Sequence, residues 1–272
     1  MIDPETPIPV LRRFNVKTLE QDYDDCTVVA SMPLGGMRNP LTGLPSVAGL
    51  AILVDDVAGR ANFFRRGRGQ WTVSSELTVE LNPDAAESLL ASPDEPVIAS
   101  ARPLGLAGPP LLAVCTLTHC GAVIGGGTVH TMPVNAGPGG PRRIADDPIA
   151  GDLNASLAQL MAVDPLPVED GIHRLHQRTD PMINNLLGIV HGGVSSAGLE
   201  LVASAAINSA GADQPMRTAS IRVNFLRPFV AGAQSVYAGT ALRVGRSYAV
   251  GDARAVGDDG KVAVIARVTG YR

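Results

Sequence analysis

The sequence predicts an α+β fold built from two copies of one unit, in which a long helix precedes an antiparallel meander of strands. Three observations support this prediction. Residues 43–55 (GLPSVAGLAILVD) align with residues 188–200 (GIVHGGVSSAGLE) at an offset of 145 residues. After each of these apolar stretches come alternating and β-branched segments that are typical of strands. The offset changes once, to 139, within the polar, proline-bearing segment 84–96, where a loop insertion is well tolerated.

In the first copy, the opening strand is expected at residues 26–33, and a loop rich in glycine, proline and asparagine follows it. Residues 47–64 are apolar over a length that favours a helix. The meander is then expected as four strands, at 71–81, 96–105, 110–119 and 122–134.

The second copy repeats this order of elements. Its opening strand is expected at 172–181 and its helix at 192–210. Four strands should follow, at 218–226, 234–245, 248–257 and 261–271. Asp258, Asp259 and Gly260 between the last two are a hairpin turn signal.

These patterns divide the chain into four segments. Residues 1–22 should form a lead segment packed outside the first sheet, and residues 23–134 the first domain. Residues 135–150, rich in glycine and proline and then charged, indicate a surface linker. The second domain is expected at 151–272 and to open with a short helix.

Composition limits the class of protein. The chain has 272 residues, is 45% hydrophobic and 18% charged, and can bury a core. Its net charge of −4 argues against binding nucleic acid. No apolar run is long enough to span a membrane, and the N-terminal residues lack the charged-then-apolar order of a signal peptide. Its three cysteines form no disulfide framework, so we expect a cytoplasmic protein.

The densest cluster of informative residues is the stretch from Asn184 to Glu200. His191, Gly192 and Gly193 open the predicted helix, where unpaired N–H groups and the helix dipole favour an oxyanion or a carbonyl oxygen. Glycine there lets an acyl group approach the backbone closely. Glu200 falls within an apolar stretch of that helix, where an acidic side chain is costly to bury unless it has a function.

This stretch resembles the hotdog-fold acyl-CoA thioesterases of the PaaI-like group, whose pattern is N-x-x-G-x-x-H-G-G followed by six residues and an acid. The positions that match this pattern are Asn185, Gly188, His191, Gly192, Gly193 and Glu200. Thr218 lies 18 residues past the acid, where the family places Thr or Ser, and residues 223–228 resemble the family's strand ending in proline. The resemblance covers the second copy and, through the repeat, more weakly the first.

The resemblance implies a double hotdog, in which each helix is wrapped by a sheet and the two domains pair. In the family, each site combines the Asn and His-Gly-Gly loop of one domain with the acid of the other. The acid acts as nucleophile or general base, and the N–H of the first glycine, here Gly192, polarises the thioester carbonyl. The implied substrate is an acyl-CoA, and no cofactor is implied.

The repeat assigns Asp55 to the acid position of the first copy. In the first copy, the positions of His191, Gly192 and Gly193 are taken by Ser46, Val47 and Ala48. Val73 aligns with Thr218, and Pro40, which is next to Asn39, aligns with Asn185. We therefore favour a complete site made of Asn185, His191, Gly192 and Asp55, in which Asp55 approaches the backbone N–H of Gly192 and Asn185. Two alternatives stay open: Glu200 and Thr218 could carry the main activity, or both sites could work. Asp56 could also replace Asp55 as the inward-facing acid.

Other residues carry weaker predictions. Gly193 is a candidate for substrate contact, and candidates for binding CoA phosphates are Arg222, Arg227, Arg243 and Arg246. His173 and His176 lack further ligands nearby, so no metal site is predicted. The rival functions are a hotdog hydratase or dehydratase and a non-catalytic acyl-CoA or lipid binder. The acyl chain and the oligomeric state, including a homo-oligomer, are left open.

Overall fold

The computed structural model describes residues 8–106, 108–135, 147–152, 154–209 and 214–272. The elements of the first half are α1 (Pro9–Arg13), β1 (Lys17–Asp22), β2 (Thr27–Met32), α2 (Gly49–Phe64), β3 (Gln70–Leu81), α3 (Ala85–Ala91), β4 (Val97–Leu104), β5 (Leu111–His119) and β6 (Ala122–Asn135). Those of the second half are α4 (Leu157–Met161), β7 (Val163–Glu169), β8 (Ile172–Gln177), the 3-10 turn η1 (Pro181–Ile183), α5 (Gly192–Ser209), β9 (Arg217–Phe225), β10 (Val236–Val244), β11 (Tyr248–Val256) and β12 (Val262–Tyr271). The predicted α+β class is confirmed.

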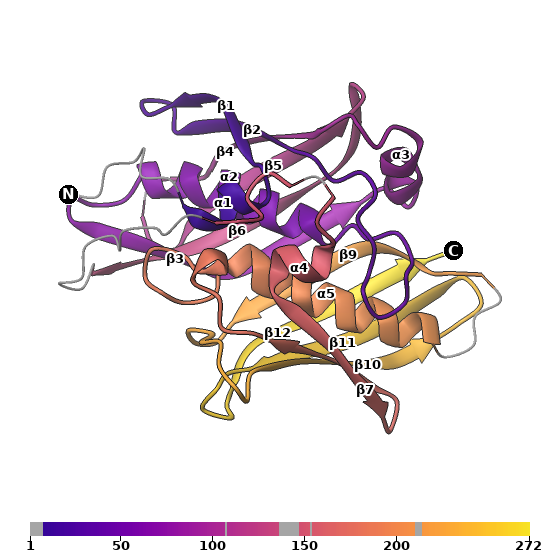
Figure 1. Ribbon diagram of the computed structural model, residues 1–272. Helices are drawn as coiled ribbons and strands as arrows, with labels where there is room; N and C mark the ends of the chain where they lie inside the picture. The colour runs from indigo at the N-terminus through magenta and orange to yellow at the C-terminus, as the bar shows by residue number, and fades with distance from the viewer. Residues whose placement is uncertain (1–7, 107, 136–146, 153, 210–213) are drawn as a thin grey trace.

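The strands form one sheet of twelve in the order β1-β2-β4-β5-β6-β3-β9-β12-β11-β10-β8-β7. From the central β3–β9 pair outward, equivalent strands follow in the same order in both halves: β3-β6-β5-β4-β2-β1 and β9-β12-β11-β10-β8-β7. Each half begins with a short helix, α1 or α4. Figure 1 shows the indigo-to-magenta half and the orange-to-yellow half joined where β3 lies beside β9. Gly43 and Gly188, which the repeat aligns, share a positive φ, of 71° and 80°.

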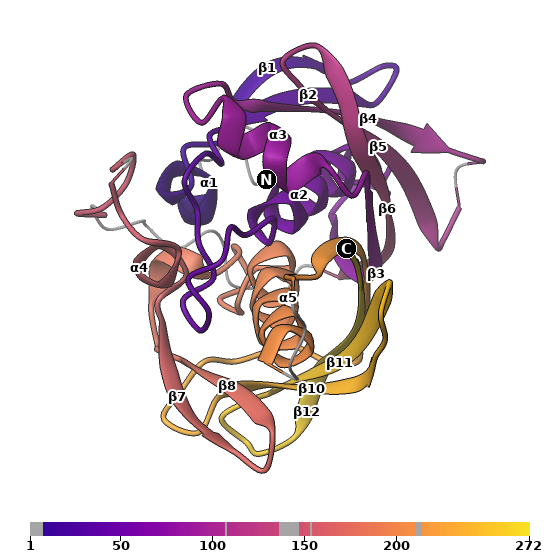
Figure 2. The ribbon, with the colours of Figure 1, turned by 90° about the vertical axis from the view of Figure 1, so that its right-hand side faces the viewer.

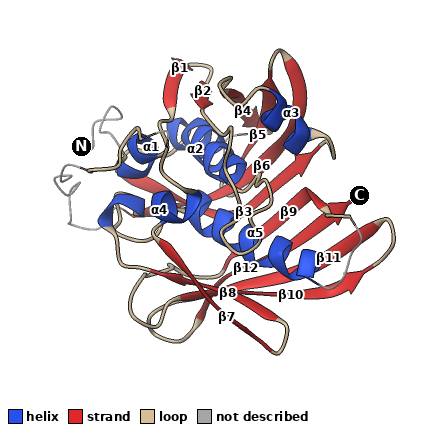
Figure 3. Cartoon of the chain, turned by 45° about the vertical axis from the view of Figure 1, so that its right-hand side comes forward, coloured by secondary structure: helices blue, strands red, loops and turns tan. Residues whose placement is uncertain are grey.

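Helices α2 and α5 lie against each other inside the curved sheet (Figures 2 and 3). Most residues of both helices are buried, which is why apolar residues are not confined to one face of either helix. Gly198 of α5 faces the ring of Tyr237, where an added Cβ would lie 2.5 Å from the ring. Within the described residues, no helix is long and apolar enough to span a membrane.

Two predictions about segments were wrong. Residues 17–22, expected outside the sheet, form its edge strand β1, which pairs with β2. Segment 84–96 was expected to be a loop, but it contains the helix α3, whose Leu89 is buried. Most of the predicted linker 135–150 lies outside the described residues, so its conformation is not assigned.

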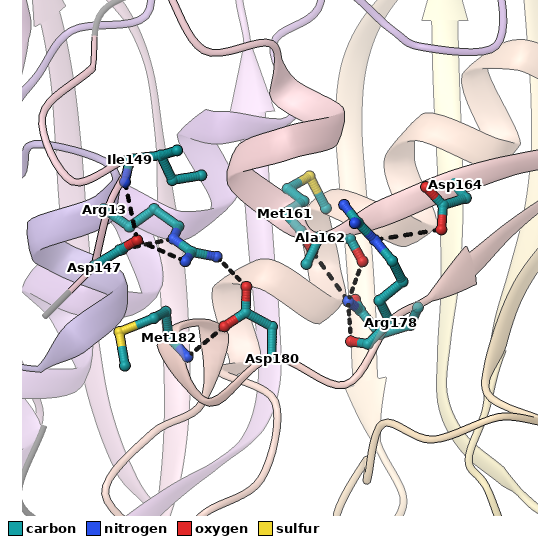
Figure 4. Close-up of polar contacts among 10 residues, drawn as sticks. Arg13, Asp147, Ile149, Met161, Ala162, Asp164, Arg178, Asp180 and Met182 are labelled. Carbon is teal, nitrogen blue, oxygen red and sulfur yellow. Dashed lines mark hydrogen bonds and ion pairs between the residues drawn. The ribbon is translucent and has the colours of Figure 1, made fainter. Parts of the chain in front are cut away.

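The end of that linker is held by a buried ion cluster (Figure 4). Arg13 of α1 donates to both oxygens of Asp147, at 2.7 and 2.8 Å, and also to Asp180. Arg13 and Asp147 are almost fully buried, so each charge depends on the other for compensation. Asp180 also caps the turn η1 by accepting the N–H of Met182 at 2.8 Å. The cluster thereby fixes the segment that leads to His191.

Candidate active site

Asp55 of α2 meets the first turn of α5 across the two halves. Its Oδ2 accepts the backbone N–H of Gly193 at 2.7 Å and lies 3.3 Å from Nδ1 of His191. Its Oδ1 accepts the hydroxyl of Ser74 on β3 at 2.7 Å. Both carboxyl oxygens are used as acceptors, as an ionised carboxylate requires. The positive end of the α5 dipole adds to the stabilisation of that charge.

The loop before α5 is built by local hydrogen bonds. The side-chain oxygen of Asn185 accepts the N–H of Leu187 at 2.9 Å, and the chain then turns through Gly188. The backbone N–H of His191 donates to Ile183, and its Nδ1 accepts the N–H of Gly193 at 3.1 Å. His191 thus caps the helix, and Asn185 shapes the loop without touching Asp55.

The two glycines allow α2 to approach the end of α5. A Cβ on Gly193 would lie 2.5 Å from the Cα of Ile52 and 3.0 Å from the backbone oxygen of Ala51. A Cβ on Gly192 would lie 2.7 Å from Oδ2 of Asp55. Position 193 therefore needs glycine because of the backbone of α2, whereas a side chain at position 192 would displace the end of the Asp55 side chain.

We expected Asp55 to lie at the N–H of Gly192, and this was wrong by one residue. The N–H of Gly193 takes that place, and among the described residues the N–H of Gly192 has no acceptor. Gly192 is half-buried and lines a cavity of about 390 Å³ together with Asp55, Asn185 and His191. An N–H of this kind can polarise a carbonyl oxygen that enters the cavity.

The rest of this cavity is largely apolar and aromatic. It runs along α2 as far as Phe63 and Trp71, whose rings meet edge to face at 4.9 Å. Phe225 and Phe229 line its second-half wall. An apolar cavity with a few polar groups at one end is the usual form of a small-molecule site.

The structure distinguishes Asp55 from its neighbour. Asp56 binds Arg60 of the same helix at 2.6 Å, and neither of its oxygens contacts the α5 loop. Of the two neighbouring acids, Asp55 is therefore the one that contacts the α5 loop, as the repeat predicts.

The second predicted acid lies in a different cavity, of about 430 Å³. Glu200 of α5 is 2% exposed, and its Oε1 accepts the hydroxyl of Thr218 at 2.5 Å. Its Oε2 has no hydrogen-bond partner among the described residues. Burial raises the pKa of Glu200 to about 7, against the opposing effect of the nearby hydroxyls of Thr218 and Ser204.

The first-half loop faces this second cavity. Ser46 Oγ accepts the N–H of Ala48 at 3.2 Å, the role that His191 Nδ1 has for Gly193. Val47, in the place of Gly192, lines the cavity and is 3% exposed. Asn39, rather than Pro40, is the counterpart of Asn185. Its side-chain oxygen accepts the N–H of Leu41, as that of Asn185 accepts the N–H of Leu187.

The alignment of Val73 with Thr218 was wrong by one residue. In the sheet, Ser74 pairs with Thr131 just before the irregularity in β3, and Thr218 pairs with Gly270 just before the irregularity in β9. Thr131 and Gly270 are 139 residues apart, the offset of the last strands, so Ser74 is the structural equivalent of Thr218. Each of these hydroxyls donates to the helix acid of its own half.

The predicted arginines are dispersed. Arg227 is exposed and lines the Asp55 cavity. Arg222 binds Glu80 at 3.0 Å and lines neither this cavity nor the one at Glu200. Arg246 lies in the turn between β10 and β11, and the Arg243 guanidinium lies over the ring of Tyr248. Of the four, only Arg227 is placed to meet a ligand in the Asp55 cavity.

No metal centre is found in the described part of the chain, where no three His, Cys, Asp or Glu side chains gather in a suitable group. His173 instead contacts the hydroxyl of Ser209 at 2.8 Å, and His176 contacts the backbone oxygen of Gly232.

The sequence analysis missed the roles of two residues at these sites. Ser74 was missed because it lies 19 residues after Asp55, whereas Thr218 lies 18 residues after Glu200. Asn39 crosses the halves and donates to the backbone oxygen of Leu201 at 2.8 Å and to Ser204 at 3.0 Å. Its place before a glycine turn was the available signal.

Comparisons with known proteins agree on the fold. Residues 187–264 match the model of the Thioesterase superfamily. The acyl-CoA thioesterase II TesB2 of Mycobacterium marinum is 13% identical over 96% of both chains, with a TM-score of 0.58. The tesB protein of Mycobacterium avium subs paratuberculosis is 15% identical over 96% of this chain and 97% of its own, with a TM-score of 0.59.

The PaaI protein of E. coli is similar to a shorter part, 44% of this chain and 85% of its own, at 21% identity and a TM-score of 0.40. No curated protein matches the sequence.

Proposed function

We propose that this chain, whose residues 187–264 belong to the thioesterase superfamily and whose fold is that of hotdog thioesterases, hydrolyses acyl-CoA thioesters at the Asp55 site. One observation carries the proposal. The Asp55 carboxylate lies at the start of α5, beside the free N–H of Gly192, at one end of an apolar cavity. A carboxylate and an oxyanion donor at one point are what thioester hydrolysis needs.

In the proposed reaction, the thioester carbonyl oxygen accepts the N–H of Gly192. Asp55 takes a proton from water, whose oxygen bonds to the carbonyl carbon, or it attacks that carbon directly and the anhydride is then hydrolysed. On the first route the C–S bond breaks and the CoA thiolate takes up the proton from Asp55. On the second the C–S bond breaks as the anhydride forms, and the thiolate takes a proton from solvent before water hydrolyses the anhydride. Gly193 and Ser74 hold the carboxylate by hydrogen bonds, while Asn185 and His191 position the loop.

The proposal extends to the domains and the substrate. We assign two tandem hotdog domains, a double hotdog, with the boundary within the linker 135–150 and with β1 included in the first domain. Arg227, exposed beside the cavity, is assigned to the phosphates of CoA. A cytoplasmic location fits a CoA ester as substrate, and assembly into a homo-oligomer remains a prediction.

Release of free thiol from a panel of acyl-CoAs tests the activity. Hydrolysis should release one thiol per substrate, without a metal or organic cofactor in the buffer. Change in enoyl absorbance without thiol would instead indicate a hydratase, and saturable binding with neither signal would indicate a binding protein. Either result would contradict the proposal.

A further inference from the structure

The cavity at Glu200 repeats most parts of the Asp55 cavity. Each contains a helix acid, a hydroxyl that donates to it and an asparagine turn. The Asp55 cavity is bordered by the first turn of α5, and the Glu200 cavity by Val47, just before α2. The wall of the second cavity has an apolar part, which includes Leu44, Pro45 and Met216. A cavity built of equivalent parts suits a ligand of the same chemical class.

The protonation of Glu200, the acid of this cavity, follows from its surroundings. Thr218 engages only one oxygen of Glu200, and the other oxygen is buried without a partner among the described residues. The charged side chains that line the cavity are those of Glu87, Arg217 and Arg272, and Arg217 binds Glu87 at 2.5 Å. With its pKa raised to about 7 by burial, Glu200 is largely neutral in mildly acidic solution. A neutral carboxyl group can donate its O–H to a carbonyl oxygen.

We propose that the Glu200 cavity is a second acyl-thioester site, which binds the ligand through its carbonyl oxygen without hydrolysing it. The ligand class rests on the proposed function of the Asp55 site. The O–H of Glu200 donates to the ligand carbonyl, and the apolar wall accommodates the acyl group.

Two features explain why this site binds without turnover. A protonated Glu200 cannot take a proton from water, so no nucleophile forms beside the bound carbonyl. Val47, just before α2, takes the aligned place of Gly192, and its side chain occupies space that the glycine leaves free. Helix α3, which has no counterpart in the second half, contributes Ala86, Glu87 and Leu90 to the wall.

Calorimetric titration with a ketone analogue of hexanoyl-CoA, in which a methylene group replaces the thioester sulfur, tests this proposal. The analogue keeps the carbonyl oxygen and cannot be hydrolysed. At pH 6 we expect two molecules of the analogue to bind per chain, one at each cavity. Between pH 6 and pH 8 the Kd of one equivalent should rise about tenfold, because only the protonated form of Glu200 binds.

Two variants identify the second equivalent. In Glu200→Gln, the amide donates at every pH, so that equivalent should lose its pH dependence and remain bound at pH 8. In Leu90→Trp, a larger side chain on the half-exposed position of α3 should remove one equivalent and leave the other at its wild-type Kd. The retained equivalent shows that this variant is folded.

One equivalent at both pH values, in a protein that releases thiol from acyl-CoA, would overturn this proposal and leave the proposed function intact. Two equivalents whose affinities do not respond to Glu200→Gln would also overturn it. Absence of both binding and thiol release would overturn both proposals.

Discussion

The Asp55 and Glu200 regions are built on equivalent elements but present different chemistry. In both, an acid from one long helix accepts a hydroxyl from the strand that follows it. Asp55 also accepts a backbone N–H from the opposite helix, whereas Glu200 leaves one oxygen without a partner among the described residues. The difference arises at a few positions: the glycines at 192 and 193 against Val47 and Ala48, and one added methylene in the acid.

This comparison shows how a repeated fold can keep its backbone while its two sites diverge. Strand order and helix packing depend on many apolar contacts, which tolerate changes in single residues. A carboxylate at a helix start depends on one N–H and on a close approach that only glycine allows. Absence of the glycines in one loop therefore removes that geometry without removing the fold.

The largest expected effect comes from the acids themselves. Asp55→Asn should lower kcat by about 10²- to 10⁴-fold, because it removes the group that attacks or activates water. Glu200→Gln should change kcat by less than about tenfold, because a neutral buried carboxyl group has no such role. Thiol-release kinetics with circular dichroism as the folding control measures both. A dead Glu200→Gln enzyme beside an active Asp55→Asn enzyme would reverse the assignment of the sites.

A large loss of stability is expected at the helix contact. Gly193→Ala would place a Cβ 2.5 Å from the Cα of Ile52, so the helices must separate, at a cost of about 3 kcal/mol. Gly192→Ala would instead press on the end of the Asp55 side chain and should lower kcat with little change in Tm. Thermal and urea unfolding of both variants measures the contrast. Equal stability of the two would contradict the packing argument.

A pH-dependent stability is expected from Glu200. Its pKa is about 7 in the folded chain against an ordinary 4.5, so the folded state binds more protons in this window. The free energy of unfolding should therefore fall as pH rises from 4.5 to 7, by up to about 3 kcal/mol. Glu200→Gln should remove this fall. The free energy of unfolding of the variant, relative to that of the wild type, should therefore be higher at pH 8 than at pH 5. Glu87→Gln, at an exposed glutamate, is the matched control, and unchanged pH dependence in Glu200→Gln would contradict the prediction.

The smallest effect tests the register of β3. Ser74→Ala removes the hydroxyl that Asp55 accepts and should lower kcat about tenfold, the size expected for a hydrogen bond to a charged group. Val73→Ala, one position earlier, should leave kcat nearly unchanged. Steady-state kinetics of the pair compares the two positions. A larger loss in Val73→Ala would restore the original alignment.

Much of the molecule can be predicted from its sequence, because the relevant signals are local. The long apolar stretches and alternating strands predict the α+β class and the order of elements in both halves. The spacing of His191, Gly192, Gly193 and Glu200 predicts a helix start with an acid on the same helix. The repeat also selects Asp55 over Asp56, and in the structure Asp56 is bound to Arg60.

Other features depend on contacts between residues far apart in the chain. The hydroxyl partner of Asp55 is Ser74 and not Val73, because the acid and the hydroxyl are 19 residues apart in the first half and 18 in the second. The crossing of α2 over α5 brings the N–H of Gly193, not of Gly192, to the acid. Strand β1 joins the sheet through pairing with β2 that residues 1–22 alone do not indicate. Sequence patterns specify which face of an element is buried. The position of each polar atom on that face depends on strand register and helix separation, which the whole packed core sets.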